Sequence, residues 1–191
     1  LVQKTFDIAP NETALSLNTK CFAAAMESFP DVIEALAGDT AEGRKQDLSE
    51  RSYYGRHDRP ATMGALEFSN NTSDLLRIVH ALDHGDYWNP LTCPKLDAGE
   101  AVLLISGAAP AEGSDDAGRV LAVEETSATI ATRDGAIRLT GLRAADGGPV
   151  DATEILAQGQ VLGTPTPPDP DFAHRAAKAD PFWRARLLAM P

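Results

Sequence analysis

Cysteines and long apolar runs are both scarce in this 191-residue sequence. The two cysteines, Cys21 and Cys93, give neither a disulfide framework nor the paired spacing of a metal site, so we expect two free thiols in a reducing cytoplasm. No apolar run approaches the roughly 20 residues that a membrane-spanning helix needs. No charged stretch precedes an apolar run at the start, so we expect that the sequence does not start with a signal peptide. We therefore expect a soluble globular chain of one or two domains with no membrane partner. Because the first residue is Leu1 and not Met, we also expect a piece of a longer protein.

Positive charge is also in short supply. The chain carries 28 Asp and Glu against 17 Lys and Arg, a net charge of −11. Between Ala65 and Gly163 the counts are 15 acidic and 6 basic residues, a net charge of −9. Proteins that bind nucleic acids neutralise phosphates with Lys and Arg, and no aromatic ladder with interleaved basic residues compensates here. We therefore expect no nucleic-acid partner.

Metal-binding and glycosylation patterns are weak. Asp83, His84 and Asp86 carry oxygen and nitrogen ligands within four residues, but no second cluster accompanies them, so we predict no metal site. Glycosylation triplets occur at Asn11 and at the pair Asn70 and Asn71. Short polar residues before an apolar run are more simply explained as helix caps.

The stretch from Gly118 to Arg143 alternates with a period of two and predicts three short strands. Asp134-Gly135 suits a two-residue hairpin turn, and we expect Thr132 to pair with Ala136 across it. This pattern alone fits any small antiparallel sheet. Asp151-Ala-Thr-Glu154 resembles a capping box that opens a short helix, which Gly159 can close, and this addition favours a small barrel. We expect one curved antiparallel sheet with a helix packed beside it; the strands are near 101–106, 118–124, 128–133 and 136–143, and the helix is 72–83.

Residues 1–40 predict one strand and one long helix. Residues 1–8 suit a strand, and the helix is capped near Asn11 or Thr13, interrupted or kinked at Pro30, and ended at Gly38. An apolar stripe follows helical spacing along it: Leu17, Cys21, Ala24, Phe29, Val32, Ile33 and Leu36. One strand and one helix cannot enclose a core. The stripe therefore needs a partner, which we expect to be a second copy through helix 13–37; the alternative is folding onto the rest of the chain.

Two sets of motifs occur in order along the chain. The later set is Gly118-x-Val-Leu-x-Val, Ile130-Ala-Thr-x-Asp-Gly-Ala-x-x-Leu139 and Asp151-Ala-x-x-x-Leu156, and the earlier motif is Ile8-Ala-Pro-Asn-Glu-Thr-Ala-Leu-Ser-Leu17. The later set resembles the C-terminal barrel of the methionyl-tRNA formyltransferase family, and the earlier motif resembles the end of its catalytic half. This family includes sugar-nucleotide formyltransferases and formylation domains fused to non-ribosomal peptide synthetases.

The resemblance implies an α+β chain in four parts. Residues 1–40 would be the last strand and helix of a Rossmann-like catalytic domain, and 41–65 a connector. Residues 66–163 would form a small open antiparallel β-barrel, OB-like, with flanking helices. Residues 164–191 would be a Pro-rich linker and either the start of a following domain or a terminal helix.

The resemblance also implies formyl transfer from 10-formyltetrahydrofolate to an amine. The family's Asn, His and Asp would lie upstream of Leu1, so we assign no catalytic residue and expect this chain alone to bind no cofactor. The connector resembles a Tyr/Phe-Gly-Arg stretch, which implies that Tyr54, Arg56 and His57 face the substrate; the alternative is a solvated connector. His57 beside Asp58 is the best candidate for proton chemistry by residue type.

Two functions remain open at this point. Phe182-Trp-Arg-Ala-Arg-Leu-Leu188 follows a Pro-rich linker and resembles the opening of a condensation or adenylation region of a peptide synthetase. With the acidic barrel, this favours a bacterial biosynthetic formyltransferase that acts on an amine of a small or carrier-bound amino-acid substrate. The expected partners are the missing N-terminal half and a carrier protein or synthetase domain. The alternative is a non-catalytic scaffold or docking module.

Overall fold

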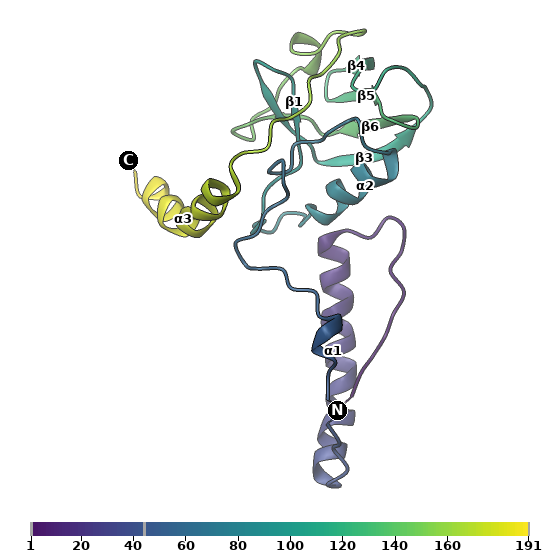
Figure 1. Cartoon of the computed structure of the whole chain (residues 1–191), viewed down its shortest axis with the longest axis vertical. Helices are drawn as coiled ribbons and strands as arrows, with labels where there is room; N and C mark the ends of the chain where they lie inside the picture. The colour runs from purple at the N-terminus through teal and green to yellow at the C-terminus, as the bar shows by residue number, and fades with distance from the viewer. Residues whose placement is uncertain (1, 44, 191) are drawn as a thin grey trace. The chain divides into compact units, whose positions relative to one another are not determined.

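A computed structural model describes residues 2–43 and 45–190 of the chain (Figure 1). The chain divides into two units, residues 1–55 and 56–191. The first unit is mostly one helix, and the second contains both sheets. No helix in the described ranges is long and apolar enough to cross a membrane.

The first unit is built on α1, Ala14–Ala37. Thr13 caps it as predicted: its hydroxyl accepts from the Ser16 amide at 3.1 Å, and the Ser16 hydroxyl accepts from the Thr13 amide at 2.9 Å. The helix continues through Pro30 without a break and ends at Gly38. A 3₁₀ turn, η1 at Leu48–Glu50, follows in the same unit.

The predicted strand at residues 1–8 is wrong for the part that the structure describes, since Leu1 lies outside it and residues 2–8 form no strand. This segment instead contacts α1. Lys4 Nζ lies 2.9 Å from Asp31 Oδ2, and Lys20 Nζ donates to the Asp7 carbonyl at 3.3 Å. The physical reason is that an extended segment becomes a strand only when another strand hydrogen-bonds to it, and this unit shows none among its described residues.

The second unit contains two small antiparallel sheets, neither of them closed, in an α+β arrangement. One sheet has the order β1-β2-β7: Lys95–Asp97, Val102–Leu104 and Arg143–Ala144. The other has the order β3-β6-β5-β4: Gly107–Ala111, Ala136–Thr140, Ser127–Ala131 and Val120–Glu124. Figure 1 shows these four strands side by side, with α2 next to β3.

The prediction of one continuous curved sheet is therefore wrong. The predicted strand 136–143 is split at Gly141, whose φ is +62°. A Cβ at Gly141 would lie 2.7 Å from the Ser106 Cβ, so the chain turns there at close range and β7 joins the other sheet. The split is repeated on the neighbouring strand, where β2 ends at Leu104 and β3 begins at Gly107.

The predicted pairing of Thr132 with Ala136 is also wrong. Ala131 pairs with Ala136, and the Thr132 amide donates to the Gly135 carbonyl at 2.9 Å, so the turn has four residues. Neither Asp134 nor Gly135 has a positive φ, as a type I′ turn requires. The longer turn leaves the Asp134 carboxylate free to contact a different element.

The core of the second unit lies between α2, Thr72–Ala81, and the sheets. Leu75 and Val79 of α2 are buried against apolar side chains from both sheets; among these are Leu96, Leu103, Ile105, Ile130, Ile137 and Leu139. The predicted capping box at Asp151 is wrong in detail, because the Asp151 carboxylate accepts from the Thr153 amide at 2.9 Å and η2, Ala152–Glu154, is a single 3₁₀ turn. A last helix, α3, spans Pro170–Leu188.

Candidate functional site

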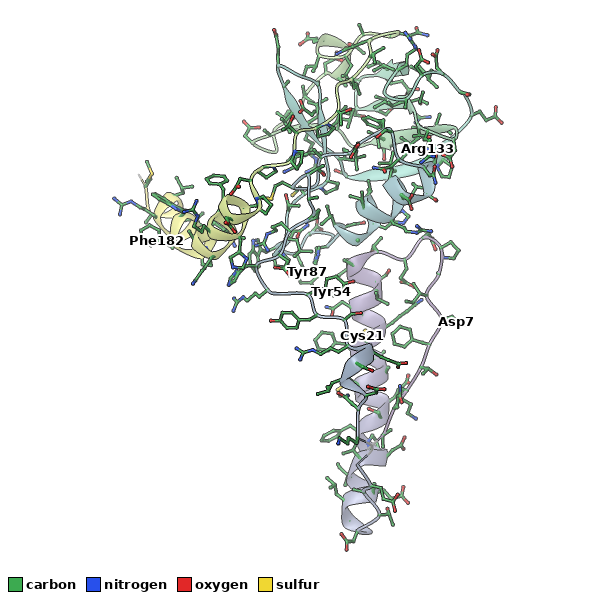
Figure 2. The ribbon with its side chains drawn as sticks, in the orientation of Figure 1. Asp7, Cys21, Tyr54, Tyr87, Arg133 and Phe182 are labelled. Carbon is green, nitrogen blue, oxygen red and sulfur yellow. The ribbon has the colours of Figure 1, made fainter. Side chains whose placement is uncertain are left out.

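The three residues predicted to face a substrate are divided between the two units. Tyr54, labelled in Figure 2, belongs to the first unit and its side chain is 87% exposed. Arg56 and His57 belong to the second unit. The His57 ring lies edge-on to His174 of α3, with 5.8 Å between the ring centroids. The structure thus places His57 beside a tail helix, and a role for these three residues in substrate binding stays a prediction.

A hollow of about 370 Å³ lies in the second unit where the loop after α2 meets β2 and β7. We call it the His84 hollow. Its volume is at the lower end of the range of about 300–1,000 Å³ that is typical of small-molecule sites. Apolar and polar side chains share its wall: Leu82, Asp83, His84, Asp86, Tyr87, Asn89, Cys93, Pro94, Leu104, Ile105, Ser106 and Arg143.

Asn89 holds the loop that forms one wall of the His84 hollow. Its side-chain nitrogen donates to the Leu82 carbonyl at 2.7 Å and to the Thr92 carbonyl at 2.5 Å. Its side-chain oxygen accepts from the amides of Leu91 at 2.8 Å and Thr92 at 3.2 Å. All the hydrogen-bonding capacity of this amide is therefore used within the loop.

His84 is the unusual residue of the hollow. Its Nε2 atom is buried and has no hydrogen-bond partner in the part of the chain that the structure describes. The turn that carries it is well fixed: the Asp83 carboxylate accepts from the Gly85 amide at 2.8 Å, and Gly85 has a φ of +59° that glycine adopts without strain. Buried polar atoms in folded proteins nearly always have a partner, so this nitrogen is an exception among the described residues.

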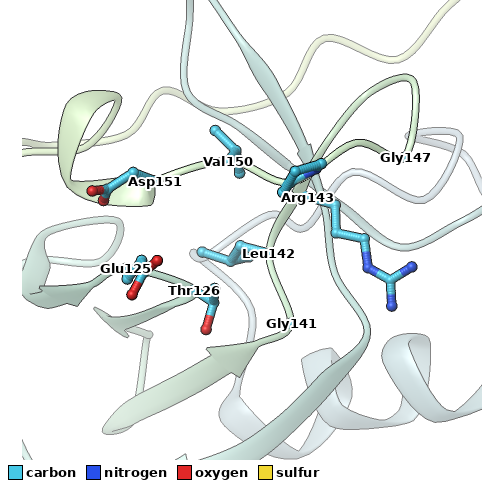
Figure 3. Close-up of a pocket in the computed structure, with 9 residues that line it drawn as sticks. Glu125, Thr126, Gly141, Leu142, Arg143, Gly147, Val150 and Asp151 are labelled. Atoms are coloured by element: carbon cyan, nitrogen blue, oxygen red, sulfur yellow. The ribbon is translucent and has the colours of Figure 1, made fainter.

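A second hollow of about 580 Å³ shares Arg143 and Gly147 with the His84 hollow (Figure 3). Glu125, Thr126 and Asp151 line it, and the Arg143 side chain points away from them. The Asp151 carboxylate is already engaged, since it accepts from the hydroxyl and the amide of Thr153, and these bonds lower its pKa. Of the two hollows, only the His84 hollow is lined by a buried polar atom that lacks a partner among the described residues.

Three of the six basic residues between Ala65 and Gly163 form ion pairs with nearby carboxylates. Arg77 contacts Asp74 at 2.6 Å, Arg119 contacts Asp115 at 2.7 Å and Asp116 at 3.0 Å, and Arg138 contacts Glu124 at 2.6 Å. Lys95 is half-buried, and this burial lowers its pKa. Only Arg133 and Arg143 remain as exposed basic groups that make no ion pair within the described residues.

Comparison with known proteins identifies the family of this acidic domain. The sequence pattern of the formyl transferase C-terminal domain matches residues 60–160, more than half of the chain. The chain belongs to the formyl transferase C-terminal domain family. The matched residues contain α2 and both sheets of the second unit, so the α+β unit with two open sheets is this formyl transferase C-terminal domain.

Two curated relatives of this chain are methionyl-tRNA formyltransferases, from Ectopseudomonas mendocina (strain ymp) and Pseudomonas paraeruginosa (strain DSM 24068 / PA7). Each is 28% identical over 170 residues, which are 85% of this chain and 52% of the relative. The chain therefore spans about half the length of these relatives.

Two solved structures of HypX variants from Aquifex aeolicus are similar in fold. One aligns with a TM-score of 0.53 at 18% identity and covers 81% of this chain and 27% of HypX. The other has a TM-score of 0.52 at 19% identity and covers 81% and 26%. At such low identity the likeness concerns the fold alone.

The residue types that the family resemblance attributes to catalysis are present in the His84 hollow, but they do not fit that role. Asn89, His84 and Asp83 supply an amide, an imidazole and a carboxylate. The Asn89 amide has both donors bonded to backbone carbonyls, so it has no hydrogen left to polarise a formyl carbonyl. We therefore derive no step of formyl transfer from this hollow.

Sequence reasoning noticed the polar loop 83–90 but missed the site that it forms. Asp83, His84 and Asp86 have the residue types of metal ligands, but the described residues contain no group of three or more His, Cys, Asp or Glu that could hold a metal ion. Asn89 precedes Pro90, and this Asn-Pro pair is a turn signal that could have indicated that Asn89 fixes the loop. Arg143 comes to the hollow from β7, about 60 residues later in the sequence, and no local pattern predicts that contact.

Proposed function

We propose that this chain is the C-terminal part of a formyltransferase whose catalytic residues lie in a preceding half. The complete enzyme would transfer a formyl group from 10-formyltetrahydrofolate to the amine of a small or carrier-bound amino-acid substrate in a biosynthetic, peptide-synthetase pathway. The family assignment and the coverage of about half of each curated relative support this division of the enzyme.

Our choice of a small or carrier-bound acceptor, in place of tRNA, rests on the charge of the C-terminal domain. Its 15 acidic residues exceed its 6 basic ones, and Arg77, Arg119 and Arg138 already pair with carboxylates. A tRNA acceptor needs a face of unpaired Lys and Arg to neutralise its phosphates. An amine on a small molecule or on a carrier protein makes no such demand.

The first unit supports the same proposal through α1. The helix is capped at Thr13 within the motif that resembles the end of a catalytic half, and none of its residues is buried in the described structure. Phe22, Phe29 and Ile33 are each more than half exposed. A helix with this much exposed apolar surface is expected where a neighbouring catalytic domain covers it.

Calorimetric titration with 10-formyltetrahydrofolate tests the division of roles. We expect the complete enzyme to bind the folate and the 191-residue chain to give no heat of binding, while circular dichroism confirms that the chain is folded. A micromolar folate complex of the chain alone would contradict the proposal, because the folate site would then lie within residues that we assign to an accessory part.

A further inference from the structure

The His84 hollow contains polar groups that the protein itself does not satisfy. His84 Nε2 is buried without a partner among the described residues. In the same described part of the chain, the side chains of Asp86, Tyr87 and Arg143 take part in no hydrogen bond or ion pair. These three side chains are exposed to solvent, so a carboxylate, a phenol and a guanidinium that the protein does not engage line one hollow together with the buried imidazole nitrogen.

The hollow is preformed and has an apolar floor. Leu82 and Ile105 are each only 4% exposed, so the floor is part of the packed core. Asn89 fixes the loop on one side through bonds to Leu82, Leu91 and Thr92. On the far side the Ser106 hydroxyl donates to the Gly141 carbonyl at 3.0 Å and holds the start of β7 in place. A rigid wall of this kind lowers the entropic cost of binding a small molecule.

The charges that line the hollow define the ligand chemistry. Two carboxylates, Asp83 and Asp86, and one guanidinium, Arg143, line the hollow. Asp83 already accepts from the Gly85 amide, so Asp86 is the carboxylate that makes no hydrogen bond within the described residues, and it is the one that we pair with a ligand cation. A ligand that pairs with both Asp86 and Arg143 carries one cationic group and one anionic group. The apolar floor adds a place for a hydrocarbon group.

We propose that the His84 hollow binds a free amino acid with an apolar side chain. Its carboxylate faces Arg143, its ammonium group faces Asp86, and a polar group of the ligand reaches His84 Nε2. Its side chain lies on Leu82 and Ile105. This inference goes beyond the proposed function, since the hollow is built entirely from residues 82–147 and requires no formyl transfer.

Nuclear magnetic resonance of the ¹⁵N-labelled 191-residue chain tests the proposal with three probes. L-leucine carries both charges, 4-methylpentanoate has the same side chain with only the carboxylate, and isoamylamine has it with only the amine. We expect saturable shifts with leucine, confined to residues 82–94, 104–106 and 143–147. We also expect leucine to bind at least about tenfold more tightly than either single-charge probe, because each lost charged hydrogen bond costs about one decade in Kd.

Two arginine variants complete the experiment. Arg143→Gln removes the guanidinium and should weaken leucine binding about tenfold or more. Arg133→Gln is the matched control, since Arg133 is also exposed but lies in the β5–β6 turn and does not line the hollow (Figure 2); it should bind leucine as the natural chain does. The proposal is overturned if leucine gives no saturable shifts at millimolar concentration, if a single-charge probe binds equally well, or if Arg143→Gln leaves leucine affinity unchanged.

Discussion

The Asp134 carboxylate accepts a hydrogen bond of 2.7 Å from the backbone amide of Thr72, which lies 62 residues earlier in the sequence. The same oxygen accepts from the Thr72 hydroxyl at 3.0 Å, and that hydroxyl lies 2.7 Å from the Thr132 hydroxyl. The N-cap residue of α2, Asn71, makes no side-chain capping bond. The β5–β6 turn thus supplies the cap that the local sequence does not, and it ties α2 to the four-stranded sheet.

Replacing Asp134 should make stability less dependent on pH. The bond from the Thr72 amide lowers the pKa of the Asp134 carboxyl from its usual 3.8. A depressed folded-state pKa contributes stability that is present above the unfolded-state value of about 3.9 and is lost as pH falls through the folded-state pKa. We therefore expect Asp134→Asn to have a lower urea midpoint than the natural chain at neutral pH. The difference between the two midpoints should shrink as pH falls below about 3.9 and through the folded-state pKa of Asp134.

The control for this prediction is Asp146→Asn. Asp146 is also exposed and caps only the Gly148 amide in its own loop, at 2.8 Å. Its replacement should leave the junction between α2 and the sheet intact. Equal urea midpoints for Asp134→Asn and the natural chain at neutral pH would show that the bond to Thr72 contributes nothing.

Removing the Asn89 amide should loosen the wall of the His84 hollow. Asn89→Ala leaves the carbonyls of Leu82 and Thr92 without their donor, and a lost bond of this kind costs about 1–3 kcal/mol. Asn89→Asp keeps an acceptor and loses both donors, so it should also destabilise the loop. Faster hydrogen exchange at the Leu91 and Thr92 amides is the readout.

Asn70→Ala is the matched control for the Asn89 variants, since Asn70 is a half-buried loop residue whose side chain makes no hydrogen bond within the described residues. It should leave the exchange rates of Leu91 and Thr92 unchanged. If the Asn89 variants also left these rates unchanged, the hydrogen bonds of the Asn89 side chain would contribute nothing to the stability of the loop.

Removing the Thr13 hydroxyl should fray the first turn of α1. The hydroxyl accepts from the Ser16 amide, and loss of such an N-cap typically costs about 1 kcal/mol. We expect faster hydrogen exchange at Ser16 in Thr13→Ala. Thr19→Ala is the control, since the Thr19 hydroxyl only donates to the Leu15 carbonyl inside the helix and alanine has the higher helix propensity. Slower exchange or no change in Thr13→Ala would argue against the cap.

The exposed face of α1 should make the 191-residue chain self-associate. Phe29 and Ile33 are 61% and 52% exposed, and apolar surface of this kind promotes association in water. Light scattering should give a mass that rises with concentration, and Ile33→Glu should abolish the rise. Leu188→Glu, an exposed position on α3, should not. A strict monomer at high concentration, with slow hydrogen exchange along α1, would show that the stripe is covered within the chain.

Local sequence signals predicted where helices and strands lie better than they predicted which distant residues contact them. The Thr13 cap, the Gly38 end and the start of α2 follow from neighbouring residues, and the structure confirms them, although α2 ends at Ala81 and not at residue 83. The predicted cap at Asn70 or Asn71 is wrong, because Asp134 from the β5–β6 turn caps α2 instead. β3 was missed because Gly107-Ala-Ala-Pro-Ala111 has no β-branched or aromatic residue and no alternation.

Errors arose where a distant residue decides the local conformation. The predicted length of the Asp134-Gly135 turn is wrong because the Asp134 carboxylate accepts a hydrogen bond from the distant Thr72 amide. Likewise, the strand breaks at Gly141 because Ser106 packs closely against it. The same reason explains the candidate site. Sequence alone marked the polar loop at 83–90, but only the fold brings Arg143 to it.

The choice of acceptor is tested most directly by a formyl-transfer assay with the complete enzyme. Labelled 10-formyltetrahydrofolate would be offered with initiator methionyl-tRNA in one reaction and with an aminoacyl phosphopantetheine in another. The methionyl-tRNA formyltransferase of Ectopseudomonas mendocina serves as the positive control for the tRNA reaction. Because the C-terminal domain is acidic and three of its arginines are paired with carboxylates, the account predicts formylation of the carrier-bound amine at a rate at least about tenfold above that of the tRNA. Preferential formylation of methionyl-tRNA would contradict it.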